Sequence, residues 1–499
     1  MDKFLSTERG GVIHRVIHRK VVTYPQVEIL ALSYYTFSNQ GEIMIELSTE
    51  LLSRIQFAFT ITFHGVFPTF NIGLGLFLVY WEYRYLRTNS DVYKKLCQFW
   101  GKIFALSFAM GVVSGVVLSY ELGANFSGFT NFSGNVLGPL IMMETMSAFF
   151  LEAGFLGIML FGWNKVSKKV HFLSTCMVAL GTVISLLWIM SANSFMHTPA
   201  GFFIEEGRMV ANSWMEVIFN PSYITRAVHM LLASVLSTSF VIMGIACYFF
   251  YRKRDVIFAS ASFIPALYIA FFLSFAQVAM GDVVGIMVLE NQPVKTAAME
   301  GNWKTQRGAP LVVFGIPDME AEKNHYEVTI PKLASFINTH DWNGELPGLD
   351  IVDKSERPPV ATVFFTFRIM VGIGILFVLL STLGVIVIRK QRLVRHPMLL
   401  KAYMASIPLG FIATTCGWYT SEIGRQPWVI YGLQRTKEAV SSLPVEQVGF
   451  SLTLIFILYM SFFVTYLIFI WKVIQKGPGS AEQLDGLGYM IDIIGIERK

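Results

Sequence analysis

Residues 417–428 read Gly417-Trp418-Tyr419-Thr420-Ser421-Glu422-Ile423-Gly424-Arg425-Gln426-Pro427-Trp428. They close a stretch, near 398–420, that is long and apolar enough to cross a membrane. Charged side chains at membrane depth are costly, so they are usually paired or functional. The segment therefore predicts a transmembrane helix with a functional site at its end.

The composition of the whole chain agrees with this. Of its 499 residues, 54% are hydrophobic and only 15% are charged, which is atypical of soluble globular proteins. No segment has the alternating pattern of a transmembrane barrel strand, so we predict an all-α integral membrane protein with nine transmembrane helices. The predicted spans lie near 54–82, 98–120, 138–163, 170–193, 227–250, 257–280, 361–388, 398–420 and 447–472.

The basic residues predict the orientation. If the first span runs from outside to inside, the cytoplasmic loops carry fourteen Lys and Arg residues and the short outer loops carry four, as the positive-inside rule requires. The amino end then lies outside and the carboxyl end in the cytoplasm. The net charge of +5 reflects this topology and implies no nucleic-acid partner. The fourteen are Arg84, Arg87, Lys94, Lys95, Lys165, Lys168, Lys169, Arg252, Lys253, Arg254, Arg389, Lys390, Arg392 and Arg395; the four are Arg208, Arg425, Arg435 and Lys437.

Five parts follow along the chain. Residues 1–43 form an extension, 44–280 hold transmembrane helices 1–6, 281–360 form an outer loop, 361–475 hold helices 7–9, and 476–499 form a cytoplasmic tail. The extension places five basic residues on the outer side and lacks the apolar core of a signal peptide. A start at Met44 is therefore the alternative to a start at Met1.

The histidines and cysteines exclude several redox centres. Of nine histidines, we expect only His64 and His229 to lie in or at the edge of a span, with His171 at a cytoplasmic margin. That is too few imidazoles for a haem–copper centre. The four cysteines lie far apart and form no Cys-x-x-Cys motif, so neither an iron–sulfur cluster nor a covalently attached c-type haem is indicated.

A histidine and a methionine suggest a haem site in the outer half of the membrane. His229 opens the fifth predicted span, and Met370 lies about ten residues into the seventh. His and Met form an axial pair for a low-spin haem, although a single Met is more often a packing residue. Arg368, two residues before Met370, needs an anion such as a haem propionate.

Two carboxylates lie within the third predicted span. Glu144 and Glu152 are eight residues apart, about 12 Å along a helix axis, with faces offset by roughly 80°. Acids so placed can pass protons inward towards one buried site. The alternative is a structural role, in which the acids brace neighbouring helices.

The opening motif offers further candidates. Arg425 and Gln426 suit the anchoring of a propionate, because a guanidinium matches a carboxylate with two hydrogen bonds. Trp418 could serve electron transfer or packing, or belong to the aromatic belt at the membrane surface.

These residues, with Thr62-Phe63-His64-Gly65-Val66-Phe67-Pro68, resemble the large, quinol-oxidising subunit I of cytochrome bd-type terminal oxidases over most of the chain from about Ser48. The short loop at 281–360 and residues 149–162 and 192–202 look most like the cyanide-insensitive branch. Phe126 is a departure, since the family pattern has Trp there.

The resemblance implies a role for each site residue. His229 and Met370 would ligate a low-spin haem b. His64 would ligate one of two high-spin haems, a haem b and a haem d or a further haem b in its place. Glu144 would lie beside a high-spin haem as a ligand of its iron, Glu152 would lie on the proton route to it, and Glu422 would be a further iron ligand. Lys295 and Glu300 match the quinol-oxidising pair, although as bare residues they could equally form a solvated ion pair.

The function implied is that of a copper-free quinol oxidase in a bacterial inner membrane. Quinol would be oxidised at the outer face and O2 reduced to water, generating a proton motive force without pumping. The resemblance implies a second membrane subunit, allows a small accessory subunit, and requires quinol, O2 and membrane lipid. Two alternatives are a haem b electron-transfer subunit without oxygen reduction and a proton-coupled transporter, which predicts an inverted repeat that the sequence does not display.

Overall fold

The computed structural model describes residues 35–37, 43–45 and 47–479. The chain divides into two units, Met1–Glu46 and Leu47–Lys499. In the first, β1 (Tyr35–Phe37) and β2 (Ile43–Ile45) form an antiparallel pair. The predictions for the extension and the tail fall mostly on residues 1–34, 38–42 and 480–499, which lie outside the described residues.

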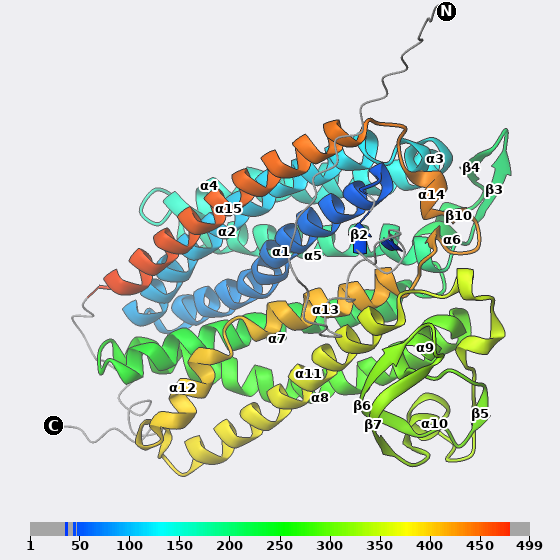
Figure 1. The fold of residues 1–499 in the computed structure, drawn as a ribbon. Helices are drawn as coiled ribbons and strands as arrows, with labels where there is room; N and C mark the ends of the chain where they lie inside the picture. The colour runs from blue at the N-terminus through cyan, green and yellow to red at the C-terminus, as the bar shows by residue number, and fades with distance from the viewer. Residues whose placement is uncertain (1–34, 38–42, 46, 480–499) are drawn as a thin grey trace, which may run out of the picture. The chain divides into compact units, whose positions relative to one another are not determined.

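The second unit confirms the predicted fold class. Its described residues contain nine helical segments long and apolar enough to cross a membrane. Seven are single helices, the third contains a π-helical segment, and the eighth is interrupted between two helices (Figure 1). In chain order the spans are α1 (Thr49–Thr88), α2 (Asp91–Ala124), α3 (Ser127–Glu144) with η1 (Thr145–Phe149) and α4 (Phe150–Phe161), α5 (Lys168–His197), α7 (Tyr223–Tyr251), α8 (Val256–Asn291), α11 (Val360–Arg389), α12 (Pro397–Ala405) with α13 (Leu409–Ile423), and α15 (Val445–Lys476).

α1 lies at the centre of the helices of this unit. It packs against α2, α5, α7 and α15 and also contacts α13 (Figure 1). Its first turn is capped by Ser48, whose hydroxyl accepts a hydrogen bond from the Leu51 backbone N–H at 3.1 Å. Large aromatic side chains fill its contact with α2, where Trp81 and Trp100 are stacked 5.9 Å apart and fully buried. Side chains on α1 can therefore meet groups from most of the other spans.

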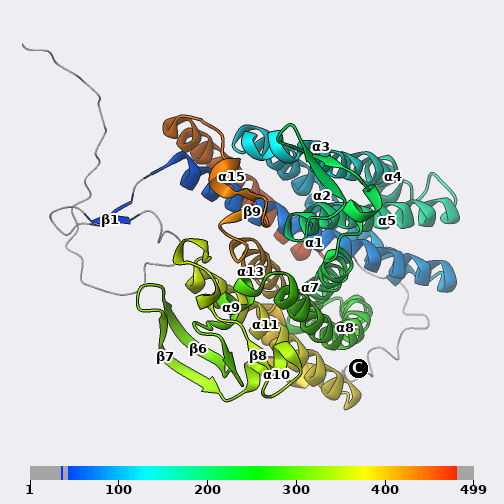
Figure 2. The ribbon, with the colours of Figure 1, turned by 90° about the vertical axis from the view of Figure 1, so that its right-hand side faces the viewer.

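The region predicted as an outer loop is a folded module beside the ends of α8 and α11 (Figure 2). α8 continues to Asn291, so the first residues of the 281–360 segment are helical. α9 follows at once, with Pro293 in its first turn and Gly301 ending it at a φ of 66°. Two antiparallel strand pairs, β6–β7 and β5–β8, complete the module with α10. Its elements are α9 (Pro293–Glu300), β5 (Gln306–Arg307), β6 (Leu311–Asp318), β7 (Lys323–Ile330), α10 (Leu333–Thr339), β8 (Glu345–Leu346), η2 (Leu349–Ile351) and η3 (Lys354–Glu356).

Short elements occupy the remaining connections. β3 and β4 form a hairpin, and so do β9 and β10, directly after the charged motif. These elements are β3 (Phe202–Glu205), β4 (Arg208–Ala211), α6 (Trp214–Ile218), η4 (Leu393–Arg395), β9 (Trp428–Ile430), β10 (Gln434–Arg435) and α14 (Thr436–Ala439).

Candidate functional site

A buried cluster of charged side chains surrounds Glu422 at the end of α13. One carboxylate oxygen, Oε1, accepts hydrogen bonds from Asn193 Nδ2 at 2.9 Å and lies 3.0 Å from His197 Nε2. The other, Oε2, is 2.5 Å from Arg425 Nη2. Glu422 is thus held by two residues of α5 and by Arg425, one turn further along its own segment. A buried carboxylate needs such hydrogen-bonding and charged partners.

The cluster continues through His197 into the loop module formed by residues 281–360. His197 is 1% exposed, and its second ring nitrogen, Nδ1, lies 3.1 Å from Lys295 Nζ in α9. Lys295 is 2% exposed. Burial, together with the positive charges of Arg226 and Arg425, lowers the pKa of the Lys295 amine well below its usual range. One imidazole therefore connects the predicted quinol-site lysine with the predicted iron ligand.

The cations of this cluster outnumber its single carboxylate. Arg226 donates to the Ser421 hydroxyl at 2.9 Å, but its Nε–H has no partner among residues 47–479. The same is true of Nε and Nη1 of Arg425 in that part of the chain. Buried guanidinium N–H groups need acceptors, and carboxylate groups are their preferred partners. The propionates of a haem would supply such groups, so these residues fit that cofactor.

Gln426 takes no part in this cluster. Its Oε1 accepts a hydrogen bond from the Thr436 hydroxyl at 2.6 Å, which ties the motif to α14. Trp418 packs instead near α1, with its ring 6.3 Å from that of Phe57. The neighbouring Tyr419 hydroxyl is 2.8 Å from Thr62 Oγ1, so this part of α13 is fastened to the turn of α1 before His64.

His64 has one ring nitrogen committed to a protein partner. Nδ1 lies 2.9 Å from the Ser114 hydroxyl in α2, which in turn donates to the Met110 carbonyl at 2.8 Å. The ring rests on Gly115, where an added Cβ would lie 3.2 Å from His64 Cε1. An imidazole whose Nδ1 is hydrogen bonded presents Nε2 to a metal, so His64 fits an axial ligand.

His229 and Met370 lie on α7 and α11, two helices that both pack against α8 and α13. Both ring nitrogens of His229 are 3.3 Å from Gln277 Nε2 of α8. Met370 lies against Gly417, where an added Cβ would be 2.7 Å from its sulfur. A larger residue at 417 would require the Met370 side chain to shift.

Arg368 points towards the loop module. It donates to the backbone carbonyls of Met299 at 2.6 Å and of Val312, the latter from Nε at 2.9 Å and also from Nη2. Its guanidinium lies 3.3 Å over the Phe364 ring. Carbonyl oxygens of α9 and β6 accept these hydrogen bonds, and a haem propionate as a further partner of Arg368 stays a prediction.

Lys295 and Glu300 do not form an ion pair, so the alternative of a solvated pair is wrong. Glu300 is 4% exposed and accepts a hydrogen bond from Asn338 Nδ2 of α10 at 3.0 Å. Burial raises the pKa of its carboxyl. Its Oε2 is buried without a partner in the described part of the chain. The two residues lie on opposite sides of α9, because five residues rotate a helix by about 140°.

Glu144 and Glu152 both face α5. Ser185 donates to Glu144 Oε1 at 2.7 Å, and Glu152 packs where Gly181 leaves room for its side chain, 2.5 Å from the position of an added Cβ. The expected offset of the two faces is wrong because η1 intervenes, in which the Phe150 N–H bonds to the Thr145 carbonyl five residues back. The additional residue brings the acids to one side of the span.

Sequence reasoning missed His197, Arg226 and a second buried pair. His197 was placed beyond the fourth span, whereas it is the last residue of α5. His171 is buried in the first turn of α5, with Nδ1 2.6 Å from Glu82 Oε1. The length of the fourth helix could have revealed His197, because a span extended by one turn beyond residue 193 includes it.

The fold and this site define a multi-pass, all-helical membrane protein with a buried charged centre suited to redox cofactors. The model of the family described as cytochrome bd terminal oxidase subunit I matches residues 52–478. The chain therefore belongs to the cytochrome bd terminal oxidase subunit I family and is subunit I of an O2-reducing quinol oxidase. The family implies haems.

Several known proteins are similar over most of their length. Cytochrome bd ubiquinol oxidase subunit 1 of Bacillus subtilis strain 168 is 32% identical, covering 86% of this chain and 94% of that protein. Cytochrome bd-II ubiquinol oxidase subunit 1 of Escherichia coli strain K12 is 31% identical, covering 86% and 97%. The structure of bd oxidase from Geobacillus thermodenitrificans matches with a TM-score of 0.81 at 29% identity, covering 87% of this chain and 99% of that one. Membership in this family sets aside the transporter and the electron-transfer subunit.

Proposed function

We propose that this chain binds three haems and oxidises quinol at the module formed by residues 281–360. A low-spin haem b would lie between His229 and Met370. A high-spin haem b and a haem d, or a further haem b in its place, would lie near His64, Glu144 and Glu422. When bound, these haems carry electrons from quinol to O2 and reduce it to water.

The observation that carries this proposal is the contact series from Lys295 through His197 to Glu422. It joins α9 of the loop module to the end of α13 by distances of 3.1 and 3.0 Å. A quinol oxidised beside α9 would therefore lie close to the groups proposed to hold a haem. Short separation between donor and acceptor is what electron transfer needs.

Quinol oxidation requires a base for a hydroxyl proton and a donor that holds the quinol oxygen. Glu300 suits the base, because a raised pKa makes its carboxylate a stronger proton acceptor and because Oε2 has no partner in the described residues. Lys295 suits the donor, since its amine carries several N–H groups and, within residues 47–479, hydrogen bonds only to His197. Asn338 would keep the Glu300 carboxyl in position.

Protons for water formation would arrive along α4 and α5. Glu152 would pass a proton to Glu144, which shares a side of the span with it and is held by Ser185. Quinol protons would leave on the outer side, so the reaction would separate charge without a pumping step. This orientation, with the amino end outside a bacterial inner membrane, rests on the distribution of basic residues.

The relatives named as subunit 1 support assembly with a second membrane subunit, and a small accessory subunit is compatible with this. Both of those relatives are named ubiquinol oxidases, while a third relative, also from B. subtilis and 30% identical over 79% of this chain, is named a putative menaquinol oxidase. We propose a quinol as substrate and assign the chain to the cyanide-insensitive, short-loop branch on the length of its 281–360 module.

A reduced-minus-oxidised absorption spectrum of the purified complex, with a pyridine haemochrome assay, tests the proposal. A far-red chlorin band beside b-type bands would identify haem d. Bands of b type alone would favour the cyanide-insensitive branch, and oxygen consumption with quinol in the presence of cyanide would then persist. A complex that contains no haem would refute the proposal.

A further inference from the structure

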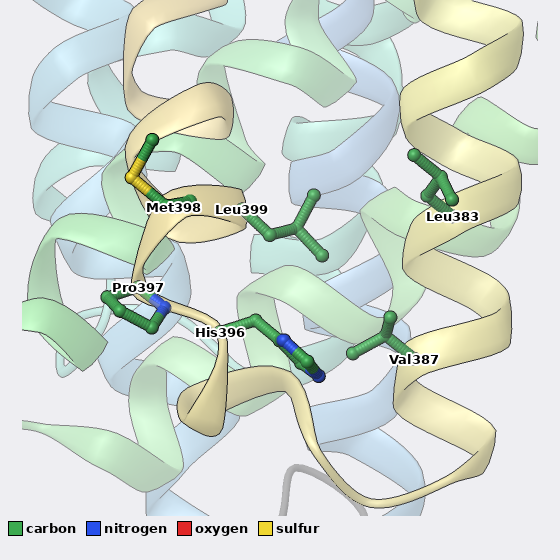
Figure 3. A pocket seen from close by; sticks show the side chains of 6 residues that line it. All are labelled: Leu383, Val387, His396, Pro397, Met398 and Leu399. Atoms are coloured by element: carbon green, nitrogen blue, oxygen red, sulfur yellow. The ribbon is translucent and has the colours of Figure 1, made fainter.

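A groove between α11 and α12 has no role in the proposed function. It encloses about 290 Å³ between the last turns of α11 and the first turn of α12. Figure 3 shows the His396 ring pointing towards Val387, with Leu383 and Leu399 above them in the view. The lining residues are Leu383, Val387, His396, Pro397, Met398 and Leu399. The groove therefore offers apolar walls with one polar group at the edge.

The segment that joins the two walls is folded against them. The Arg392 backbone N–H donates to the Val387 carbonyl at 3.2 Å, and the His396 N–H donates to the Leu393 carbonyl at 3.1 Å. Leu393, in η4, is fully buried and anchors the segment. Side chains of this segment are thus held at the edge of the groove by a defined backbone.

This segment is strongly basic. Arg389, Lys390, Arg392 and Arg395 are all exposed, as is His396. Within residues 47–479, no acidic side chain forms an ion pair with Arg389, Lys390 or Arg392. The helix dipole of α12, which begins at Pro397, adds positive potential at the same edge. The charge of this edge calls for an anionic ligand.

The groove also lies where a lipid headgroup would be. α11 is a candidate membrane span that ends at Arg389, so the basic segment begins at the end of a spanning helix. Basic pockets between transmembrane helices at this level bind anionic headgroups, while apolar walls accept hydrocarbon. A protein segment would need matching acidic groups, and the apolar walls continue along the exposed side of α11, where Leu379 is 55% exposed.

We propose that the α11–α12 groove binds one anionic phospholipid. An acyl chain lies against Leu383, Val387 and Leu399, and the phosphate is held by Arg389, Lys390 and Arg392. His396 hydrogen bonds to the headgroup at the edge of the groove. This site is separate from the haem and quinol sites and does not depend on their assignment.

Lipid retention by the two-subunit complex tests this. The complex is reconstituted in nanodiscs of phosphatidylcholine with a minor fraction of phosphatidylglycerol, and the lipids that remain bound are counted by native mass spectrometry. The triple variant Arg389→Gln, Lys390→Gln, Arg392→Gln should retain about tenfold less phosphatidylglycerol than the wild type. Each of the three cations contributes to the attraction of the anionic headgroup. The control triple Arg87→Gln, Lys165→Gln, Lys169→Gln removes the same charge from other basic loops and should retain it.

A second pair of variants tests the groove without changing the charge. Val387→Trp fills the cavity and should reduce retention as the charge variant does, whereas Val170→Trp, an exposed position in the first turn of α5, should not. The proposal would be overturned if both triple variants retained the same amount of phosphatidylglycerol. It would also be overturned if the wild-type complex retained phosphatidylcholine as well as it retains phosphatidylglycerol. Phosphatidylglycerol binding that appears only after truncation beyond Gly479 would overturn it too, since the acidic tail would then be the occupant.

Discussion

His197 is the residue on which three distant segments converge. Its imidazole contacts Lys295 at 3.1 Å and Glu422 at 3.0 Å. We predict that His197→Ala lowers the free energy of unfolding by about 1–3 kcal/mol, because two buried charged groups each lose a partner. Thermal unfolding of the purified complex measures this. His340→Ala, which removes an exposed partner of Asp282, is the control and should melt like the wild type; equal melting of the two variants would contradict the prediction.

The predicted role of His229, as a ligand of the low-spin haem, likewise depends on a single side chain. Its replacement by Ala should remove the absorption of the low-spin haem and leave the high-spin signals in place. The matched control is His325→Ala, a histidine of β7 that is paired with Asp318 in the loop module. If the low-spin signal persists in His229→Ala, the ligand assignment fails.

The π-helical segment η1 acts at the scale of the element. It places Glu144 and Glu152 on the same side of the third span, where both meet α5. A regular α-helix could present the acids in the same way only if they were seven residues apart, close to two turns. The position of the acids therefore depends on the backbone of the whole segment and not on their own side chains.

Insertion and deletion at Met146 separate these effects. Insertion of one Ala after Met146 should rotate Glu144 away from Ser185 by about 100° and reduce quinol-dependent oxygen consumption at least tenfold. Deletion of Met146 should restore a regular helix with the acids seven residues apart and keep most of the activity. Oxygen uptake by purified complexes with matched haem content measures both. An active insertion variant, or a deletion as harmful as the insertion, would rule out this role of η1.

At the scale of the whole molecule, the distribution of basic residues predicts on which side of the membrane each part lies. Alkaline phosphatase, which is active only outside the cytoplasm, should be active when inserted in the turn between β6 and β7. Green fluorescent protein should fluoresce when fused to the carboxyl end. The controls exchange the two reporters: alkaline phosphatase at the carboxyl end should be inactive, and green fluorescent protein in the β6–β7 turn should not fluoresce. The opposite pattern would reverse the proposed sides of quinol oxidation and proton uptake.

The sequence predicted most of the fold but only part of the candidate site. Hydropathy predicted nine spans, and the structure contains nine candidates in its described residues. The fourth was ended too early because Ser194 and His197 are polar, although both are buried and hydrogen bonded. The cluster joins α5, α9 and α13, which lie far apart in sequence, so no local pattern could reveal it. A π-helical turn likewise leaves no mark in apolar periodicity.

Arg368 fastens the loop module to α11 through carbonyl oxygens of residues 299 and 312. Every residue type has that carbonyl, so the anchor is indifferent to which side chains stand at either position. Substitutions in the module can therefore accumulate, in evolution or in a designed library, without detaching it from the helix. If this module holds the quinol, as proposed, recognition of a new quinol could be selected by exchanging side chains on it while its attachment stays the same.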